Sequence, residues 1–99
     1  MIGQDSHEVE RKAISILKVL NESPHPLGAR LIARRLKDYG VELGERAVRY
    51  HLKLMDERGL TRPLQRRDGR EITTQGIEEL NERRHNYLSI PTFYEQFRI

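Results

Sequence analysis

Apolar and polar residues follow the period of an α-helix most clearly between Leu43 and Leu60, in the stretch LGERAVRYHLKLMDERGL. At about 100° per residue, the apolar stripe consists of Val48, Leu52 and Met55, with Ala47 at its edge. The opposite face carries Arg46, Arg49, Tyr50 and Lys53. Gly44 precedes the pattern, and Gly59 ends it as a left-handed residue. The pattern predicts a helix that packs on one side and exposes long hydrogen-bond donors on the other.

A second helical pattern opens the chain and runs to about Asn21. Asp5 or Ser6 can cap it, with Glu8 in capping-box register, and Pro24 and Pro26 prevent it from continuing. Its apolar stripe consists of Val9, Ala13, Ile16, Leu17 and Leu20, whereas Ile14 and Val19 lie off the stripe. The polar face mixes both charge signs, which indicates a scaffold helix.

A third pattern starts after Pro26 and ends at Gly40. Its buried face consists of Ala29, Ile32, Ala33 and Leu36, and its other face carries Arg30, Arg34 and Lys37. These three cations either keep the helix soluble or lie against phosphates. Only residues 41–44 separate this pattern from the next helix. So short a turn containing glycine predicts a helix-turn-helix unit, in which the second helix reads the major groove.

Two short extended segments, residues 60–64 and 70–73, follow Gly59. Between them, Asp68-Gly69 is a strong hairpin signal, and Pro63 suits an edge strand. Such a hairpin is marginal alone and must lean on the helices. Its turn region carries the cations Arg66, Arg67 and Arg70. A basic hairpin after a helix-turn-helix is typical of a wing.

Thr73 is predicted to cap a fourth helix, with Ile77 and Leu80 facing inward and Arg84 and Tyr87 continuing that side. Its outer face carries Glu78, Glu79 and Glu82. The order of elements predicts an α+β, mostly α fold: a winged helix-turn-helix with a three-helix bundle, a two-stranded wing and an additional C-terminal helix. The DNA-binding domain is expected over residues 1–86. Residues 87–99 form an apolar tail, expected either as a dimer contact or as a linker to a further C-terminal domain.

The charge is distributed unevenly along the 99 residues, whose net charge is +3. Residues 30–70 hold twelve Arg and Lys against six Asp and Glu, a local charge of +6. This concentration is typical of a protein that binds a polyanion, although a solvated surface would look similar. No run of about 18 apolar residues and no secretory signal is present, so we expect a cytoplasmic protein without a membrane partner.

Catalytic and cofactor chemistry find little support in the sequence. Cysteine is absent, and the histidines His7, His25, His51 and His85 fall on separate elements, so no metal site is predicted. His51 lies beside the apolar stripe and is expected to be a packing residue rather than a base. No phosphate-binding glycine loop is present. We therefore expect no enzyme and no cofactor.

The polar face of the helix that begins near Gly44 has the groups that groove contact requires. Arg46, Arg49 and Tyr50 are expected to contact bases, and Lys53 a phosphate. Glu45 either accepts from a cytosine amino group or favours the helix N-terminus through the dipole, of which the second is simpler. Together with the wing, this face favours groove binding over a merely solvated surface.

The segments PLGARLIARRL, LGERAVRYHLKLMDERGL and ITTQGIEEL, with the turn-containing hairpin between the last two, resemble the N-terminal winged-helix domain of archaeal NrpR-type nitrogen regulators. This domain belongs to the ribonuclease R winged-helix domain family. The resemblance spans about residues 7–83. It implies a repressor of nitrogen-assimilation genes that binds a palindromic operator as a homodimer. It also implies that 2-oxoglutarate acts on larger C-terminal domains, which are absent from this sequence.

Two other functions are compatible with a winged helix. One is an RNA-binding accessory domain of an exoribonuclease, and the other is a protein-interaction module. The basic excess over residues 30–70 disfavours the protein-interaction module. No catalytic segment accompanies the domain, which disfavours the exoribonuclease. The sequence therefore favours specific binding to double-stranded DNA.

Overall fold

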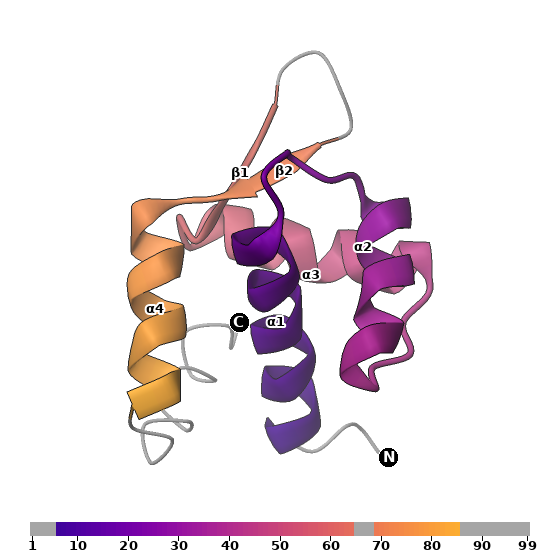
Figure 1. The fold of residues 1–99 in the computed structure, drawn as a ribbon, viewed down its shortest axis with the longest axis horizontal. Helices are drawn as coiled ribbons and strands as arrows, with labels where there is room; N and C mark the ends of the chain where they lie inside the picture. The colour runs from indigo at the N-terminus through magenta and orange to yellow at the C-terminus, as the bar shows by residue number, and fades with distance from the viewer. Residues whose placement is uncertain (1–5, 65–68, 86–99) are drawn as a thin grey trace.

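The computed structural model describes residues 6–64 and 69–85, and the side chains of residues 8–64 and 69–82. Its elements are α1 (Ser6–Glu22), α2 (Ala29–Leu36), the 3₁₀ turn η1 (Lys37–Tyr39), α3 (Glu45–Glu57), β1 (Thr61–Pro63), β2 (Arg70–Ile72) and α4 (Thr74–His85). In Figure 1, α1 stands between α2 and α4, α3 crosses behind it, and the β1–β2 hairpin projects beyond one end of the helices. This arrangement confirms the predicted winged helix-turn-helix. Ser6 is the first residue of α1. Asp5, the side chain of Ser6 and the tail at 87–99 lie outside the described part of the chain.

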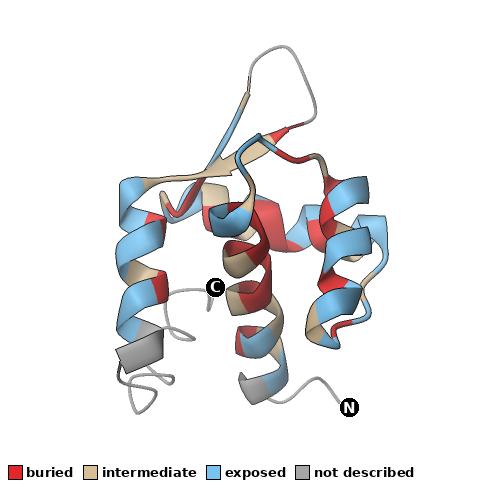
Figure 2. Ribbon diagram, in the orientation of Figure 1, coloured by how far each residue is buried: buried red, intermediate tan, exposed pale blue. Residues whose placement is uncertain are grey.

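The core is built from the buried faces of the first three helices, closed by residues from the connections and from α4 (Figure 2). Burial of each large aliphatic side chain contributes about 1.5–3 kcal/mol. The buried members are Ala13, Ile16, Leu17, Val19, Leu20, Leu27, Ala29, Ile32, Leu36, Val41, Val48, Leu52, Met55, Leu60 and Leu80. The predicted stripes of α2 and α3 are confirmed, with Ala33 and Ala47 half-buried at their edges.

Helix α1 is buried on more sides than the sequence pattern predicts. Val19, expected off the stripe, is 2% exposed, and Val9, expected on it, is only half-buried. The reason is that α1 contacts α2, α4 and β2 at once. A helix surrounded in this way buries a second face, and Ser15 on that face is buried as well.

The turn between α2 and α3 is closed by a left-handed glycine. Helix α2 tightens into η1, and Gly40 follows with φ 73°. The Val41 N–H then donates to the Leu36 carbonyl at 3.0 Å. Arg11 of α1 donates from Nη2 to the Gly40 carbonyl at 3.0 Å, which ties the turn to the first helix. This geometry fixes the angle at which α3 leaves the bundle.

The wing contains one more extended segment than the predicted hairpin. Strands β1 and β2 pair antiparallel, with Arg62 opposite Glu71 and Pro63 opposite Arg70. On its other side, β2 pairs with the α1–α2 connection: Arg70 donates its N–H to the Leu27 carbonyl at 2.8 Å, and Leu27 donates back at 3.0 Å. Strand β2 is therefore central, and β1 with Pro63 is the edge, as predicted.

Helix α4 approaches the hairpin through a glycine. Gly76 lies so close that a Cβ built on it would be 2.2 Å from the Leu60 carbonyl oxygen. Gly76 and Leu80, four residues apart, define the inward face, and Leu80 is fully buried. The prediction that Ile77 faces inward is wrong: it is 37% exposed, because it lies on the flank of this face. Glu79, on the other flank, is half-buried instead of pointing outward.

Candidate nucleic-acid interface

Helix α3 presents the predicted contact residues on an exposed face. Burial of Val48, Leu52 and Met55 fixes the helix by its opposite side. Arg46, Arg49 and Lys53 are exposed, and Tyr50 is 59% exposed. The helix begins after Gly44, which has extended backbone and supplies no side-chain cap. The first backbone N–H groups of α3 therefore lie beside the exposed cations.

Glu45 and Arg49 form an ion pair on this face. The Nη2 of Arg49 donates to the Glu45 carboxylate at 2.6 Å, and both side chains are about half exposed, at 49% and 45%. An exposed i,i+4 pair of this kind contributes only about 0.3–0.5 kcal/mol. The pair orients the guanidinium along the helix but releases it at small cost. Glu45 thus has a partner within the protein, beyond the two roles expected from the sequence.

Two cations of α2 and the first residue of η1, Lys37, gather beside the start of α3. Arg30, Arg34 and Lys37 line a surface depression of about 340 Å³ together with Ala33, Leu43, Gly44 and Glu45. All three cations are exposed. The depression therefore combines three positive charges and the positive end of the α3 dipole with one carboxylate, that of Glu45, which is paired with Arg49. This is an arrangement suited to an anionic group such as a backbone phosphate.

The side chain of the wing residue Arg70 packs against α3. Arg70 is only 20% exposed, and its Nε donates to the Asp56 carboxylate at 3.1 Å, so its guanidinium is held against α3 rather than presented to solvent. Arg66 and Arg67 lie outside the described residues. Of the residues proposed from sequence for the wing, the described part therefore contains one, and its side chain is engaged in the fold.

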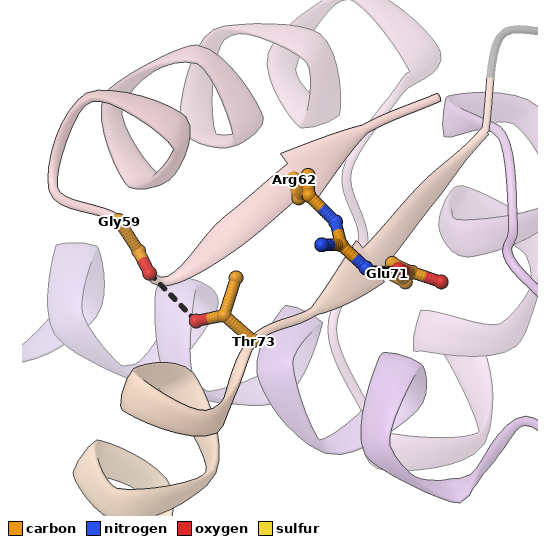
Figure 3. Close-up of polar contacts among 4 residues, drawn as sticks. All are labelled: Gly59, Arg62, Glu71 and Thr73. Atoms are coloured by element: carbon orange, nitrogen blue, oxygen red, sulfur yellow. Dashed lines mark hydrogen bonds and ion pairs between the residues drawn. The ribbon is translucent and has the colours of Figure 1, made fainter. Parts of the chain in front are cut away.

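Arg62 is an exposed wing cation that the sequence analysis did not single out. Its side chain is 67% exposed and pairs across the hairpin with Glu71 (Figure 3). The alternation along β1 gives the signal, since Thr61 points inward at 3% exposure and the next residue must point outward. At the base of the hairpin, the Thr73 hydroxyl donates to the Gly59 carbonyl at 2.6 Å (Figure 3). The same hydroxyl accepts from the Gly76 N–H at 3.0 Å. The predicted Thr73 cap is confirmed.

His51 is a buried packing residue, as predicted. It is 7% exposed, and its ring lies edge-on to that of Tyr50, with centroids 5.8 Å apart. Burial lowers the pKa of His51 below its ordinary value, and the nearby positive charge of Lys12 lowers it further. The ring is therefore neutral in the folded domain at neutral pH.

The lowered pKa makes stability depend on pH. Below the ordinary pKa of about 6.5, the unfolded chain protonates His51 while the folded domain does not. The free energy of unfolding should therefore fall as the pH drops from about 7 through 6. We expect His51→Gln to show a smaller fall than the wild type, measured by urea unfolding at each pH. Identical pH profiles for His51→Gln and the wild type would contradict the prediction.

Within the described residues, no group of three or more His, Asp or Glu could hold a metal ion. In the same part of the chain, no helix is long and apolar enough to cross a bilayer. The chemistry of the exposed face is that of hydrogen-bond donors and cations.

Three relatives are global nitrogen regulators of methanogens. The chain is 57% identical over 67 residues to NrpR of Methanococcus maripaludis, 49% over 75 residues to NrpRI of Methanosarcina mazei, and 46% over 80 residues to NrpR of Methanocaldococcus jannaschii. The matches cover 68%, 76% and 81% of this chain but only 12%, 23% and 15% of those proteins. They confirm the resemblance inferred from the sequence segments.

No solved structure matches the chain significantly. The sequence model of the ribonuclease R winged-helix domain matches residues 14–80, from the middle of α1 to the buried Leu80 of α4. The match thus spans the helix-turn-helix and the wing, and includes the exposed face of α3 and the cation-lined depression. The chain belongs to the ribonuclease R winged-helix domain family.

Proposed function

We propose that the chain binds double-stranded DNA sequence-specifically as a domain of a transcriptional regulator. The observation that carries the proposal is the juxtaposition of the exposed polar face of α3 with the cation-lined depression at its N-terminus. The face of α3 supplies groups that can read base edges, and the depression supplies positive charge for the phosphates that flank those bases. Both lie on one helix-turn-helix unit, whose second helix enters the major groove in known complexes.

The roles divide by position and by chemistry. Arg46, Arg49 and Tyr50 are assigned to bases. They lie in the first half of α3, and they carry a guanidinium with paired N–H donors or a phenol hydroxyl. The phosphate contacts are assigned to Arg30, Arg34, Lys37 and Lys53. In the wing, Arg66 and Arg67 remain candidates from sequence, and the exposed Arg62 joins them. Arg70 is reassigned from DNA contact to a role within the wing, because its guanidinium pairs with Asp56.

The biological role follows from the relatives. All three bear the name of global nitrogen regulators rather than of enzymes, which supports a repressor of nitrogen-assimilation genes over an exoribonuclease accessory domain. The chain matches only a small part of each, so the remaining functions belong to whole proteins of that kind. We propose that such a protein binds a palindromic operator as a homodimer and responds to 2-oxoglutarate through other domains. A cytoplasmic location fits this role.

The salt dependence of binding tests the proposal. A duplex obtained by selection from genomic fragments is titrated with the 99-residue chain and followed by fluorescence anisotropy over roughly 50–200 mM salt. The logarithm of the binding constant should fall linearly with the logarithm of the salt concentration. The slope should be about −0.9 for each neutralised phosphate, hence about −3.6 for the four cations assigned on the helices and the turn between them, and steeper by about 0.9 for each wing cation that meets a phosphate.

An RNA duplex of the same sequence and a scrambled DNA duplex are the matched controls. Both should bind more weakly than the selected DNA at every salt concentration. A flat salt response would contradict DNA binding through phosphates. Tighter binding of the RNA duplex would instead favour the RNA-binding alternative.

A further inference from the structure

Asp56, in the last turn of α3, holds both strands of the wing. Its Oδ1 accepts from the Thr61 hydroxyl of β1 at 2.5 Å, and its Oδ2 accepts from Arg70 Nε of β2 at 3.1 Å. Thr61 is 3% exposed, and the Asp56 and Arg70 side chains are each 20% exposed. One carboxylate on α3 thus binds a residue from each strand, in a position largely removed from water. We call Asp56, Thr61 and Arg70 the wing clamp.

The wing clamp is continuous with the rest of the domain through the backbone of Arg70. This residue pairs on both its N–H and its carbonyl with Leu27 of the α1–α2 connection, at 2.8 and 3.0 Å. Leu27 is itself buried in the core at 4% exposure. Arg70 therefore fixes β2 to the connection by its main chain and to α3 by its side chain. Two independent attachments on opposite sides define the direction in which the hairpin projects.

A short hairpin needs such attachments to hold one orientation. Two-stranded hairpins are marginally stable alone, and here the strands have three residues each. When a charge pair is largely removed from water, loss of one partner strongly destabilises the local structure, because the remaining charge stays desolvated. Exposed pairs, such as Arg62 with Glu71, are screened by water and constrain the hairpin far less. Among the side-chain contacts of the wing described here, the wing clamp therefore constrains the angle to α3 most strongly.

We propose that Asp56 is a positioning residue for DNA binding, which sets the angle between the wing and α3 without contacting the nucleic acid. The proposal rests on the proposed function, because a fixed angle matters only if both elements meet the same duplex. With α3 in the groove, a wing at the right angle brings its cations to the neighbouring phosphates. A wing released from α3 loses those contacts although all its cations are retained.

The charge of Asp56 makes the test discriminating. Asp56→Asn raises the net charge by one, so electrostatic attraction alone predicts tighter binding to DNA. Loss of the wing clamp predicts the reverse: at least about ten-fold weaker binding, and a shallower slope of log K against log salt, because fewer phosphates are neutralised. The matched control is Glu57→Gln, the same charge change at the next, exposed residue of α3. This control should bind as tightly as the wild type or more tightly.

Arg70→Lys provides a second variant that leaves the net charge unchanged. Lysine keeps the positive charge but lacks the Nε–H that reaches Asp56, so binding should weaken and the salt slope should again become shallower. All binding is measured by anisotropy on the selected duplex, below the melting temperature of each variant. If Asp56→Asn does not fold, the binding of Arg70→Lys alone tests the positioning role. A lower fraction of folded protein would reduce the apparent affinity in proportion to that fraction without changing the slope.

The outcomes separate the two proposals. If the wild type binds with the expected salt slope, Asp56→Asn matches Glu57→Gln and Arg70→Lys matches the wild type in affinity and slope, the positioning role is overturned and the proposed function stands. If the wild type shows no salt-dependent binding to DNA, the proposed function is overturned and the positioning role with it.

Discussion

Gly76→Ala should destabilise the domain by about 2 kcal/mol or more, although alanine normally favours a helix over glycine by about 1 kcal/mol. The added Cβ would meet the Leu60 carbonyl oxygen at 2.2 Å and Ile72 Cγ1 at 2.7 Å. The carbonyl belongs to the backbone at the base of the wing and accepts the Thr73 N–H at 3.1 Å, so it cannot swing aside. Helix α4 would have to move away from the hairpin and would loosen Leu80 in the core.

Urea unfolding of Gly76→Ala beside Gly44→Ala measures this effect. Around Gly44, a Cβ would meet no heavy atom within 4 Å, so the same substitution there removes only the N-cap preference of glycine. That change should cost no more than about 1 kcal/mol. Equal losses in the two variants would show that the contact of α4 with the hairpin is looser than the distances imply.

Simultaneous replacement of Arg30, Arg34 and Lys37 by alanine should weaken binding to every DNA duplex by roughly 100-fold or more near 0.1 M salt. Each neutralised phosphate releases about 0.9 counterions, so the salt slope should become shallower by about 2.7. The ratio of affinities for the selected and the scrambled duplex should stay unchanged, because phosphate contacts position the protein and do not read sequence. Anisotropy titrations on both duplexes over a salt series provide the measurement.

The matched control replaces Lys12, Lys18 and Arg35 with alanine, which removes three cations that do not line the depression. It lowers the net charge by the same amount, at positions away from the depression beside α3. Its salt slope should remain close to that of the wild type. Equal changes in the two triple variants would mean that binding depends on overall charge alone, and the depression would lose its assigned role.

Most of the helical scaffold could be predicted from sequence because its determinants are local. The stripe of α3 repeats at helical spacing, and Gly59, predicted to be left-handed, has φ 77°. Val19 and Ile77 were assigned to the wrong sides because one helix's periodicity does not tell how many neighbours surround it. The pairing of Leu27 with Arg70 could not be predicted either, since a single residue in extended conformation has no period to detect.

In the candidate interface as well, some side-chain roles could be predicted from the sequence and others could not. The exposed face of α3 could be predicted, because it is the complement of a buried stripe on the same helix. Arg70 was assigned to DNA from charge and position alone, and its partner Asp56 stands 14 residues earlier in the chain. Nothing in the neighbourhood of either residue indicates the pairing. The role of a charged side chain depends on what packs beside it, which a count of charges does not contain.

Pro63, in the edge strand β1, affects how these domains behave at high concentration. The exposed edge of a sheet can pair with another chain through its backbone, and this is a common route to aggregation. Here the inner edge is occupied by Leu27, and the outer strand ends in Pro63, which has no N–H to donate. Arg62 adds an exposed charge on the same strand. Copies can therefore gather at high local concentration, with their hairpins protruding into solvent, while strand-to-strand association is suppressed.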